Sequence, residues 1–248
     1  MNMQSSPHRR VRLWSGLLGA ASFLLAFLVL TVLIPGPLRP LDLLFNDFRG
    51  QNFDAVRPYL QVLDRVGQRA ICVPILVAVA AWASYRAKSK RPLVVTALSV
   101  LALNAFVALF KFGLERGAPL DNEPDFLVNG VMYPSGHAAN VLLVYGLAVY
   151  IWCRYTDATR RTYWLSVVTV AILTVVMFMT SLSLRWHWFT DLVAGLLVGA
   201  ATLRATVVID RAVPFTPLRE TREQVTRPSD QHRRRHDREA GKATSPER

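Results

Sequence analysis

The first apolar block of the chain is VRLWSGLLGAASFLLAFLVLTVLI, residues 11–34. A helix of about 20 predominantly apolar residues crosses the hydrocarbon core of a bilayer. The block is longer than the roughly 7–15 apolar residues of a signal peptide, and it ends before Pro35 without a small-residue cleavage site. We therefore expect residues 11–34 to form a retained transmembrane helix.

Five further apolar blocks follow, and each approaches the length that a membrane span needs. They cover residues 70–85, 92–112, 138–153, 163–182 and 188–209. Hydrophobic residues make up 52% of the chain, yet its net charge is +12. Because the basic residues cluster at the ends of apolar blocks, this charge favours membrane orientation over nucleic-acid binding. The sequence predicts an all-α fold, a six-transmembrane-helix bundle over residues 12–211.

The basic residues also predict how the bundle is oriented. They concentrate in the N-terminal segment 1–11, in the loops 86–91 and 154–161, and in the tail 212–248. By the positive-inside rule, these four segments face the cytoplasm. The tail is polar and cannot bury a core, so we expect it to be disordered. The chain is thus expected to be a multi-pass protein of the cell membrane with both termini in the cytoplasm.

Two stretches between the first two spans carry apolar residues at helical spacing. These residues are Leu41, Leu44, Phe45 and Phe48 in the first stretch, and Phe53, Val56, Leu60 and Leu63 in the second. Aspartates occupy the other faces of both stretches. The pattern predicts two short helices at the membrane interface. A lid that packs over the bundle is the favoured role, ahead of specific substrate recognition.

Three polar stretches lie at the ends of spans, all on the predicted extracytoplasmic face. They contain Lys111 and Arg116 after the third span, Pro134-Ser135-Gly136-His137 before the fourth, and His187 and Asp191 before the sixth. Polar and ionisable groups near membrane depth are costly and usually functional. Each stretch alone also fits a purely structural role, such as a helix cap or a lysine that snorkels to the membrane interface. Their shared face favours one common site.

The residue types in these stretches suit phosphate chemistry. A glycine-bearing turn at a helix N-terminus offers free N–H groups to an anion, and Lys111 and Arg116 can neutralise phosphate oxygens. His187 and Asp191 are four residues apart, so on a helix they share one face. A carboxylate on one imidazole nitrogen leaves the other free to attack. His137 can then protonate the leaving oxygen.

These motifs resemble those of the type 2 phosphatidic acid phosphatase (PAP2) family of membrane lipid phosphatases, related to soluble vanadium haloperoxidases. The family carries the signatures Lys-x6-Arg-Pro, Pro-Ser-Gly-His and Ser-Arg-x5-His-x3-Asp. The second signature is complete at residues 134–137, and its spacing to the third fits. The resemblance covers the six-helix core, residues 12–211.

The resemblance implies a mechanism without metal or cofactor. His187 would attack phosphorus and form a phosphohistidine, supported by Asp191. His137 would protonate the leaving group and later activate water. The phosphate oxygens would be held by Lys111, Ser135 and Gly136.

The chain departs from the signatures at two arginine positions. Ala118 stands where the first signature has arginine, although Arg116 matches an arginine that many members carry two residues earlier. In the third signature, the arginine position is Ser181. Arg185 is a nearby candidate for phosphate binding, but on a regular helix it would point away from His187. Arg185 can take this role only if the chain bends between the two residues.

We therefore expect an integral membrane lipid phosphatase that acts on a phosphorylated membrane lipid at the extracytoplasmic leaflet. The substrate would be a phosphomonoester or diphosphate of a phospholipid or polyprenyl lipid, cleaved through a phosphohistidine intermediate. The missing arginines favour an alternative, a catalytically weak PAP2-like protein that binds phosphorylated lipid or an envelope-building complex. A transporter is disfavoured, because no charged or helix-breaking residues mark matching halves of the chain.

Overall fold

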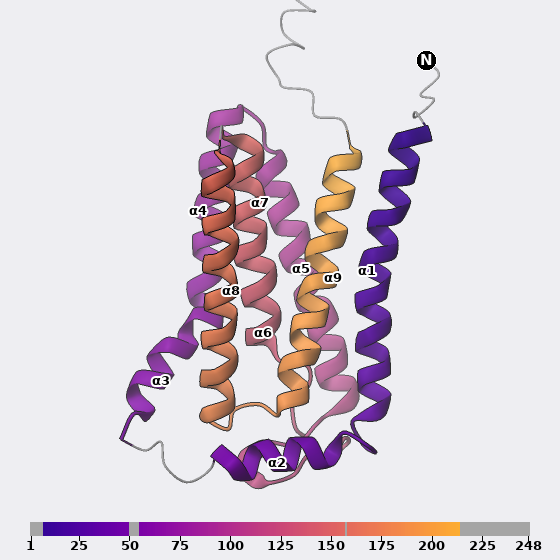
Figure 1. The fold of residues 1–248 in the computed structure, drawn as a ribbon, viewed down its shortest axis with the longest axis vertical. Coiled ribbons are helices and arrows are strands. Elements are labelled where there is room, and N and C mark those ends of the chain that lie inside the picture. Colours follow the sequence, from indigo (N-terminus) through magenta and orange to yellow (C-terminus); the bar gives the residue numbers. More distant parts are fainter. Residues whose placement is uncertain (1–6, 50–54, 157, 214–248) are drawn as a thin grey trace, which may run out of the picture.

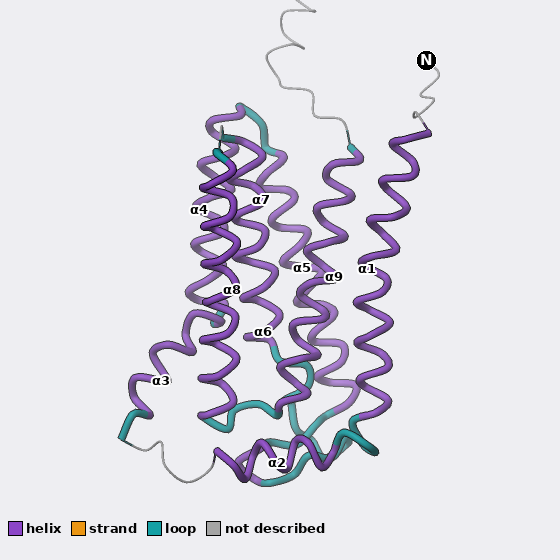
Figure 2. Tube along the Cα trace, viewed as in Figure 1, coloured by secondary structure: helices purple, strands orange, loops and turns teal. Residues whose placement is uncertain are grey.

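A computed structural model of the chain describes residues 7–49, 55–156 and 158–213. Over these ranges the regular secondary structure is entirely helical, and long helices run side by side in one bundle (Figures 1 and 2). Six of the helical spans are long and apolar enough to cross a membrane. The predicted all-α bundle of six spans is confirmed.

The ends of the spans lie within a few residues of the ends of the apolar blocks. They are α1 (Pro7–Leu33), α4 (Arg69–Ala87), α5 (Arg91–Leu114), α8 (Arg160–Ser183), α9 (Phe189–Ala212) and a composite fourth span. The fourth span joins α6 (Gly136–Asn140), the π-helical segment η3 (Val141–Tyr145) and α7 (Gly146–Tyr155). π-Helical turns inside helices are frequent at functional sites, and this one begins four residues after His137.

Apolar side chains cover the outside of the bundle as well as its core. Leu25, Leu101 and Val175 are 63%, 65% and 61% exposed although they lie in the middle of their helices. Such an apolar outer surface suits lipid rather than water. The chain is therefore a multi-pass membrane protein.

Two short helices lie between the first two spans, as the sequence predicted. The helix α2 (Arg39–Arg49) crosses the end of the bundle, and α3 (Arg57–Asp64) leads through the 3-10 turn η1 (Arg65–Gly67) into α4 (Figure 1). Phe53 lies outside the described residues, as do residues 1–6 and residues 214–248 of the expected disordered tail.

Helix ends are set by local chemistry next to the polar stretches. Ser135 caps α6, because its Oγ accepts a hydrogen bond from the N–H of Ala138 at 3.4 Å. Glu115 ends α5 in a left-handed conformation with φ 45°. This conformation breaks the helix and directs the following residue, Arg116, back over the end of the bundle.

Two glycines bring α6 and α9 into direct contact. A Cβ on Gly195 would lie 2.4 Å from the carbonyl oxygen of Ser135, and one on Gly199 would lie 2.7 Å from that of Ala139. Only glycine permits such a close approach of two backbones. Helix α6, which Ser135 caps, and helix α9, which carries Asp191, are therefore packed in direct backbone contact.

Candidate active site

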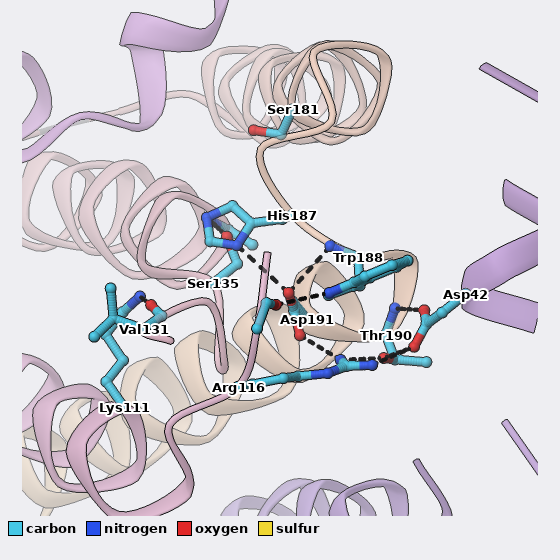
Figure 3. A network of polar contacts seen from close by, with 12 residues as sticks. Asp42, Lys111, Arg116, Val131, Ser135, Ser181, His187, Trp188, Thr190 and Asp191 are labelled. Carbon is cyan, nitrogen blue, oxygen red and sulfur yellow. Dashed lines mark hydrogen bonds and ion pairs between the residues drawn. The ribbon is translucent and has the colours of Figure 1, made fainter. Parts of the chain in front are cut away.

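The three polar stretches meet at one end of the bundle, where α5 ends and α6 and α9 begin (Figures 1 and 3). The backbone N–H of Ser135 donates to the carbonyl of Asp191 at 3.0 Å. Nη1 of Arg116 lies 2.5 Å from Oδ1 of Asp191. Residues that are far apart in the sequence thus form one site.

His187 lies in the loop between α8 and α9, which corrects the expectation that it shares a helix with Asp191. The chain turns at Arg185 with φ 56°, and Asp191 Oδ2 accepts the N–H of Trp188 at 3.0 Å. This cap starts α9 after His187. The carboxylate still faces the imidazole, with Nδ1 of His187 lying 3.6 Å from Oδ2 of Asp191. The contact is made by Nδ1, so Nε2 is the ring nitrogen that does not face Asp191.

Arg116 is completely buried behind Asp191, and its guanidinium is occupied by protein groups (Figure 3). It also lies 2.6 Å from Oδ2 of Asp42 and donates to Thr190 Oγ1 at 2.8 Å and to the Pro124 carbonyl at 2.9 Å. The ring centroids of Phe126, Trp188 and Tyr133 lie 5.4, 5.7 and 6.0 Å from its Cζ. Arg116 therefore holds Asp191 in place and presents no donor to a substrate.

The helix α2 reaches this buried network through Asp42. Its Oδ1 accepts the N–H of Thr190 at 2.9 Å, in the first turn of α9. Burial raises the pKa of the Asp42 carboxyl, and the positive charge of Arg116 opposes that rise. The short helix is thus more than an apolar lid, because it carries one of the two carboxylates that balance Arg116.

Arg185 adopts the bend that would let it approach the site, but its guanidinium is engaged elsewhere. Its Nε donates to Oδ1 of Asn46 on α2 at 2.9 Å, and Nη2 donates to the Pro119 carbonyl at 3.0 Å. Arg185 therefore ties the loop that carries His187 to α2.

In Figure 3, Ser135 lies beside His187, and Lys111 lies to the left of Asp191, away from the Arg116 guanidinium. Nζ of Lys111 donates to the carbonyl of Val131. Ser135 is fully buried at the start of α6, where the following N–H groups point out of the helix end. A lysine beside a helix N-terminus is a combination suited to phosphate oxygens.

His137 faces His187 across a short space, with ring centroids 6.1 Å apart. Its Nε2 lies 3.3 Å from Oδ2 of Asp64, a fully buried residue at the end of α3. Burial raises the pKa of the Asp64 carboxyl, whereas a hydrogen bond from the Ser181 hydroxyl to Oδ1 lowers it. The signature position that has lost its arginine, Ser181, is therefore filled by a hydroxyl paired with a carboxylate.

Arg69, at the start of α4, is a second cation near Lys111. A Cβ on Gly136 would lie 3.8 Å from its Nη2, and Arg69 interacts electrostatically with both Lys111 and His137. Within the described part of the chain, its guanidinium makes no hydrogen bond or ion pair. Arg69 is exposed.

The segment from Asp64 to Arg69 forms one wall of the site. A Cβ on Gly67 would lie 2.9 Å from Cβ of His137, and Asn140 Nδ2 donates to the Gly67 carbonyl at 3.4 Å. The sequence analysis did not predict that this segment is part of the site. The predicted topology could have indicated it, because it places the start of the second span at the same membrane face as the three polar stretches.

Comparison with known proteins identifies the family. The family model of the PAP2 superfamily matches residues 92–215, from α5 to the end of α9. The chain belongs to the PAP2 superfamily. The match contains all three polar stretches, whereas Asp42, Asp64 and Arg69 lie outside it. The PAP2 signatures therefore account for only part of this site.

A solved structure shares the PAP2 fold of this chain. It is a crystal structure described as the first transmembrane PAP2 type phosphatidylglycerolphosphate phosphatase from Bacillus subtilis. The TM-score is 0.69 at 19% identity, covering 79% of this chain and 98% of that one. At this identity the likeness shows the fold. A comparison with curated proteins gave no significant match.

Proposed function

We propose that this chain is a membrane lipid phosphatase that removes phosphate from a phosphomonoester or diphosphate of a phospholipid or polyprenyl lipid. One observation carries the proposal: two imidazoles face each other, each beside a buried carboxylate. His187 lies beside Asp191, and His137 lies beside Asp64. A nucleophile and a proton donor placed on two sides of one space suit in-line displacement at phosphorus.

In the first step, Nε2 of His187 attacks phosphorus, and the bond from phosphorus to the lipid oxygen breaks. His137 gives its proton to that oxygen, so the lipid leaves as an alcohol, or as a monophosphate when the substrate is a diphosphate. Asp191 accepts from Nδ1 and stabilises the positive charge that develops on His187. The product of this step is a phosphohistidine on His187.

In the second step, His137 takes a proton from water as the water oxygen attacks the phosphohistidine. The phosphorus–nitrogen bond breaks, inorganic phosphate leaves, and His187 returns to its starting state. Asp64 stabilises the positive charge on His137 that this proton transfer creates. Both steps balance without a further reactant.

The phosphate oxygens are held by Lys111, by Ser135 and the N–H of Gly136, and by Arg69. Cations that face the transferring group stabilise charge in the transition state. Arg116 and Arg185, which the sequence suggested as phosphate ligands, act instead as positioning residues. The contacts of Arg116 with Asp191 and of Arg185 with Asn46 support this assignment.

The site is proposed to lie at the extracytoplasmic leaflet. The basic ends of α4 and α7 are at the opposite end of the bundle from α2, which lies at the end where α9 begins (Figure 1). The positive-inside rule places those basic ends, and with them both termini, in the cytoplasm. The lipid substrate would then approach the histidines from the outer half of the bilayer.

A catalytically weak relative that binds phosphorylated lipid is the second candidate. The pairing of Ser181 with Asp64 favours it, because a carboxylate stands near the position where the family has a cation. Negative charge there opposes phosphate binding unless Asp64 is compensated by His137 or Arg69. Catalytic turnover separates the two functions.

The test is phosphate release by the purified full-length protein in detergent. The panel contains phosphatidic acid, phosphatidylglycerol phosphate and undecaprenyl diphosphate, with His187→Ala as the inactive control. We expect wild-type release well above the control for at least one lipid, and a labelled phosphohistidine trapped at short times. Equal release by both proteins across the panel would favour the binding function.

A further inference from the structure

A cavity lies in the half of the bundle opposite the histidines. It is a groove of about 1020 Å³ between α7, α8 and α9, bordered by Phe23 of α1. Its walls are mostly apolar, and include Leu142, Val170 and Leu203. The groove shares no residue with the histidine site.

The groove follows one face of α9 for the depth of one leaflet. Ala200, Leu203, Arg204, Val207 and Arg211 line it at helical spacing. Residues 200 and 211 are about 17 Å apart along the helix axis. Half of a hydrocarbon core is about 15 Å thick. The groove therefore has the length of a single acyl chain.

The charged residues in this groove are all arginines. Arg154, Arg204 and Arg211 line it, and the described lining contains no acidic residue. Arg154 is paired with Asp210, its Nε lying 2.9 Å from Oδ2. Arg204 and Arg211 have no carboxylate partner within the described ranges. The groove thus carries two positive charges that no carboxylate of the described residues pairs with.

Arg204 is unusual because it lies within a membrane span. It stands about 12 Å before the end of α9 and is exposed. Its one protein hydrogen bond among the described residues is a long one, from Nε to the Gly16 carbonyl at 3.5 Å. An arginine at that depth is costly without an anionic or polar partner. An anion within reach of Arg204 and Arg211 would provide one.

We propose that the groove binds one anionic phospholipid of the leaflet opposite the histidine site. One acyl chain lies along α9, and the phosphate and its net charge sit at Arg211 and Arg204. Basic pockets between transmembrane helices bind acidic lipid head groups in this way. A neutral lipid fits the apolar part equally well but leaves the two arginines unbalanced. This site is independent of the phosphatase reaction.

The test is native mass spectrometry of the full-length protein in a neutral detergent. Equal amounts of phosphatidylglycerol and phosphatidylcholine with identical acyl chains are added, and the lipid that stays bound when the detergent is removed is measured. Since each arginine near the membrane surface adds to the binding of acidic lipid, we expect phosphatidylglycerol to be retained over phosphatidylcholine by on the order of tenfold. In Arg204→Gln/Arg211→Gln the ratio should fall to about one, whereas Arg204→Lys/Arg211→Lys should keep most of it.

Two further variants locate the lipid. Ala171→Trp fills the groove without changing its charge, so it should reduce retention of either lipid and remains informative if the arginine variant does not fold. Arg39→Gln, an exposed arginine at the other end, should change nothing. Equal retention of the two lipids by wild type overturns the proposal. So does a preference that survives in Arg204→Gln/Arg211→Gln, or one that is lost only in Arg69→Gln.

Discussion

Oδ2 of Asp64 lies 3.3 Å from Nε2 of His137, and both atoms are buried. The same carboxylate accepts a hydrogen bond from Ser181 through Oδ1. An aspartate on the short helix α3 is therefore positioned to support the proposed acid–base histidine, in the way proposed for Asp191 and His187. This second His–Asp pair lies outside the region that the PAP2 family model matches.

Replacing Asp64 by asparagine should slow the reaction without weakening substrate binding. The neutral amide cannot stabilise a protonated His137, so we expect kcat to fall by roughly 10- to 100-fold, within the range that acid–base catalysis contributes. KM should change little, because Asp64 faces His137 and not the lipid. Phosphate-release kinetics measure both constants. Asp47→Asn, an exposed aspartate on α2, is the matched control, and an unchanged kcat in Asp64→Asn would refute the role.

The same substitution should change how stability depends on pH. Burial raises the pKa of Asp64 above the value of 3.8 that it has when unfolded. Asp64 therefore binds a proton more readily in the folded than in the unfolded protein, so its stabilising contribution is complete below pH 3.8 and is lost as the pH rises through the folded pKa. Asp64→Asn should remove this decrease in folding stability with rising pH, so the variant should melt at a higher temperature than wild type at neutral pH. Melting curves in detergent from about pH 4 to about pH 7 test this.

Removing the charge of Arg116 should destabilise the protein and also abolish activity. Arg116→Met leaves the carboxylates of Asp42 and Asp191 buried without a cation, which costs about 3–5 kcal/mol. Adding Asp42→Asn should recover part of that stability but not the activity, because Asp191 is still unsupported. Arg39→Met breaks an exposed ion pair with Asp125 and should cost less than about 1 kcal/mol. If Arg116→Met raises only KM and melts like wild type, Arg116 is a substrate ligand instead.

Arg69→Ala should weaken substrate binding while leaving the fold intact. Arg69 is exposed and makes no hydrogen bond or ion pair with the rest of the described chain, so the melting temperature should not fall. Loss of one charge-assisted contact to phosphate corresponds to about tenfold in KM. Arg69→Lys should restore part of it. Arg65→Ala, an exposed arginine of η1, serves as the control, and equal KM values for the two alanine variants would exclude phosphate contact by Arg69.

The site residues that the sequence predicted lie in local motifs, whereas the roles that it did not predict depend on partners far away in the chain. His187, His137 and Lys111 were predicted because each sits in a short motif at the end of a span. The roles of Arg116 and Arg185 were not predictable in this way. Their partners, Asp42 and Asn46, come from α2, which is about 70 and 140 residues away along the chain. No local spacing reveals a hydrogen bond across that separation.

The sequence by itself determined the number of spans, their approximate ends and the end of the bundle at which the polar stretches gather, because bilayer thickness and helix geometry constrain each segment independently. Only the tertiary structure decided what each charged group does there. It turned Arg116 inward onto Asp191, placed Asp64 against His137, and brought Arg69 beside Gly136. The energy of a buried charge depends on which groups surround it. For Arg116, Asp64 and Arg69 those groups come from distant segments that meet only when the bundle packs.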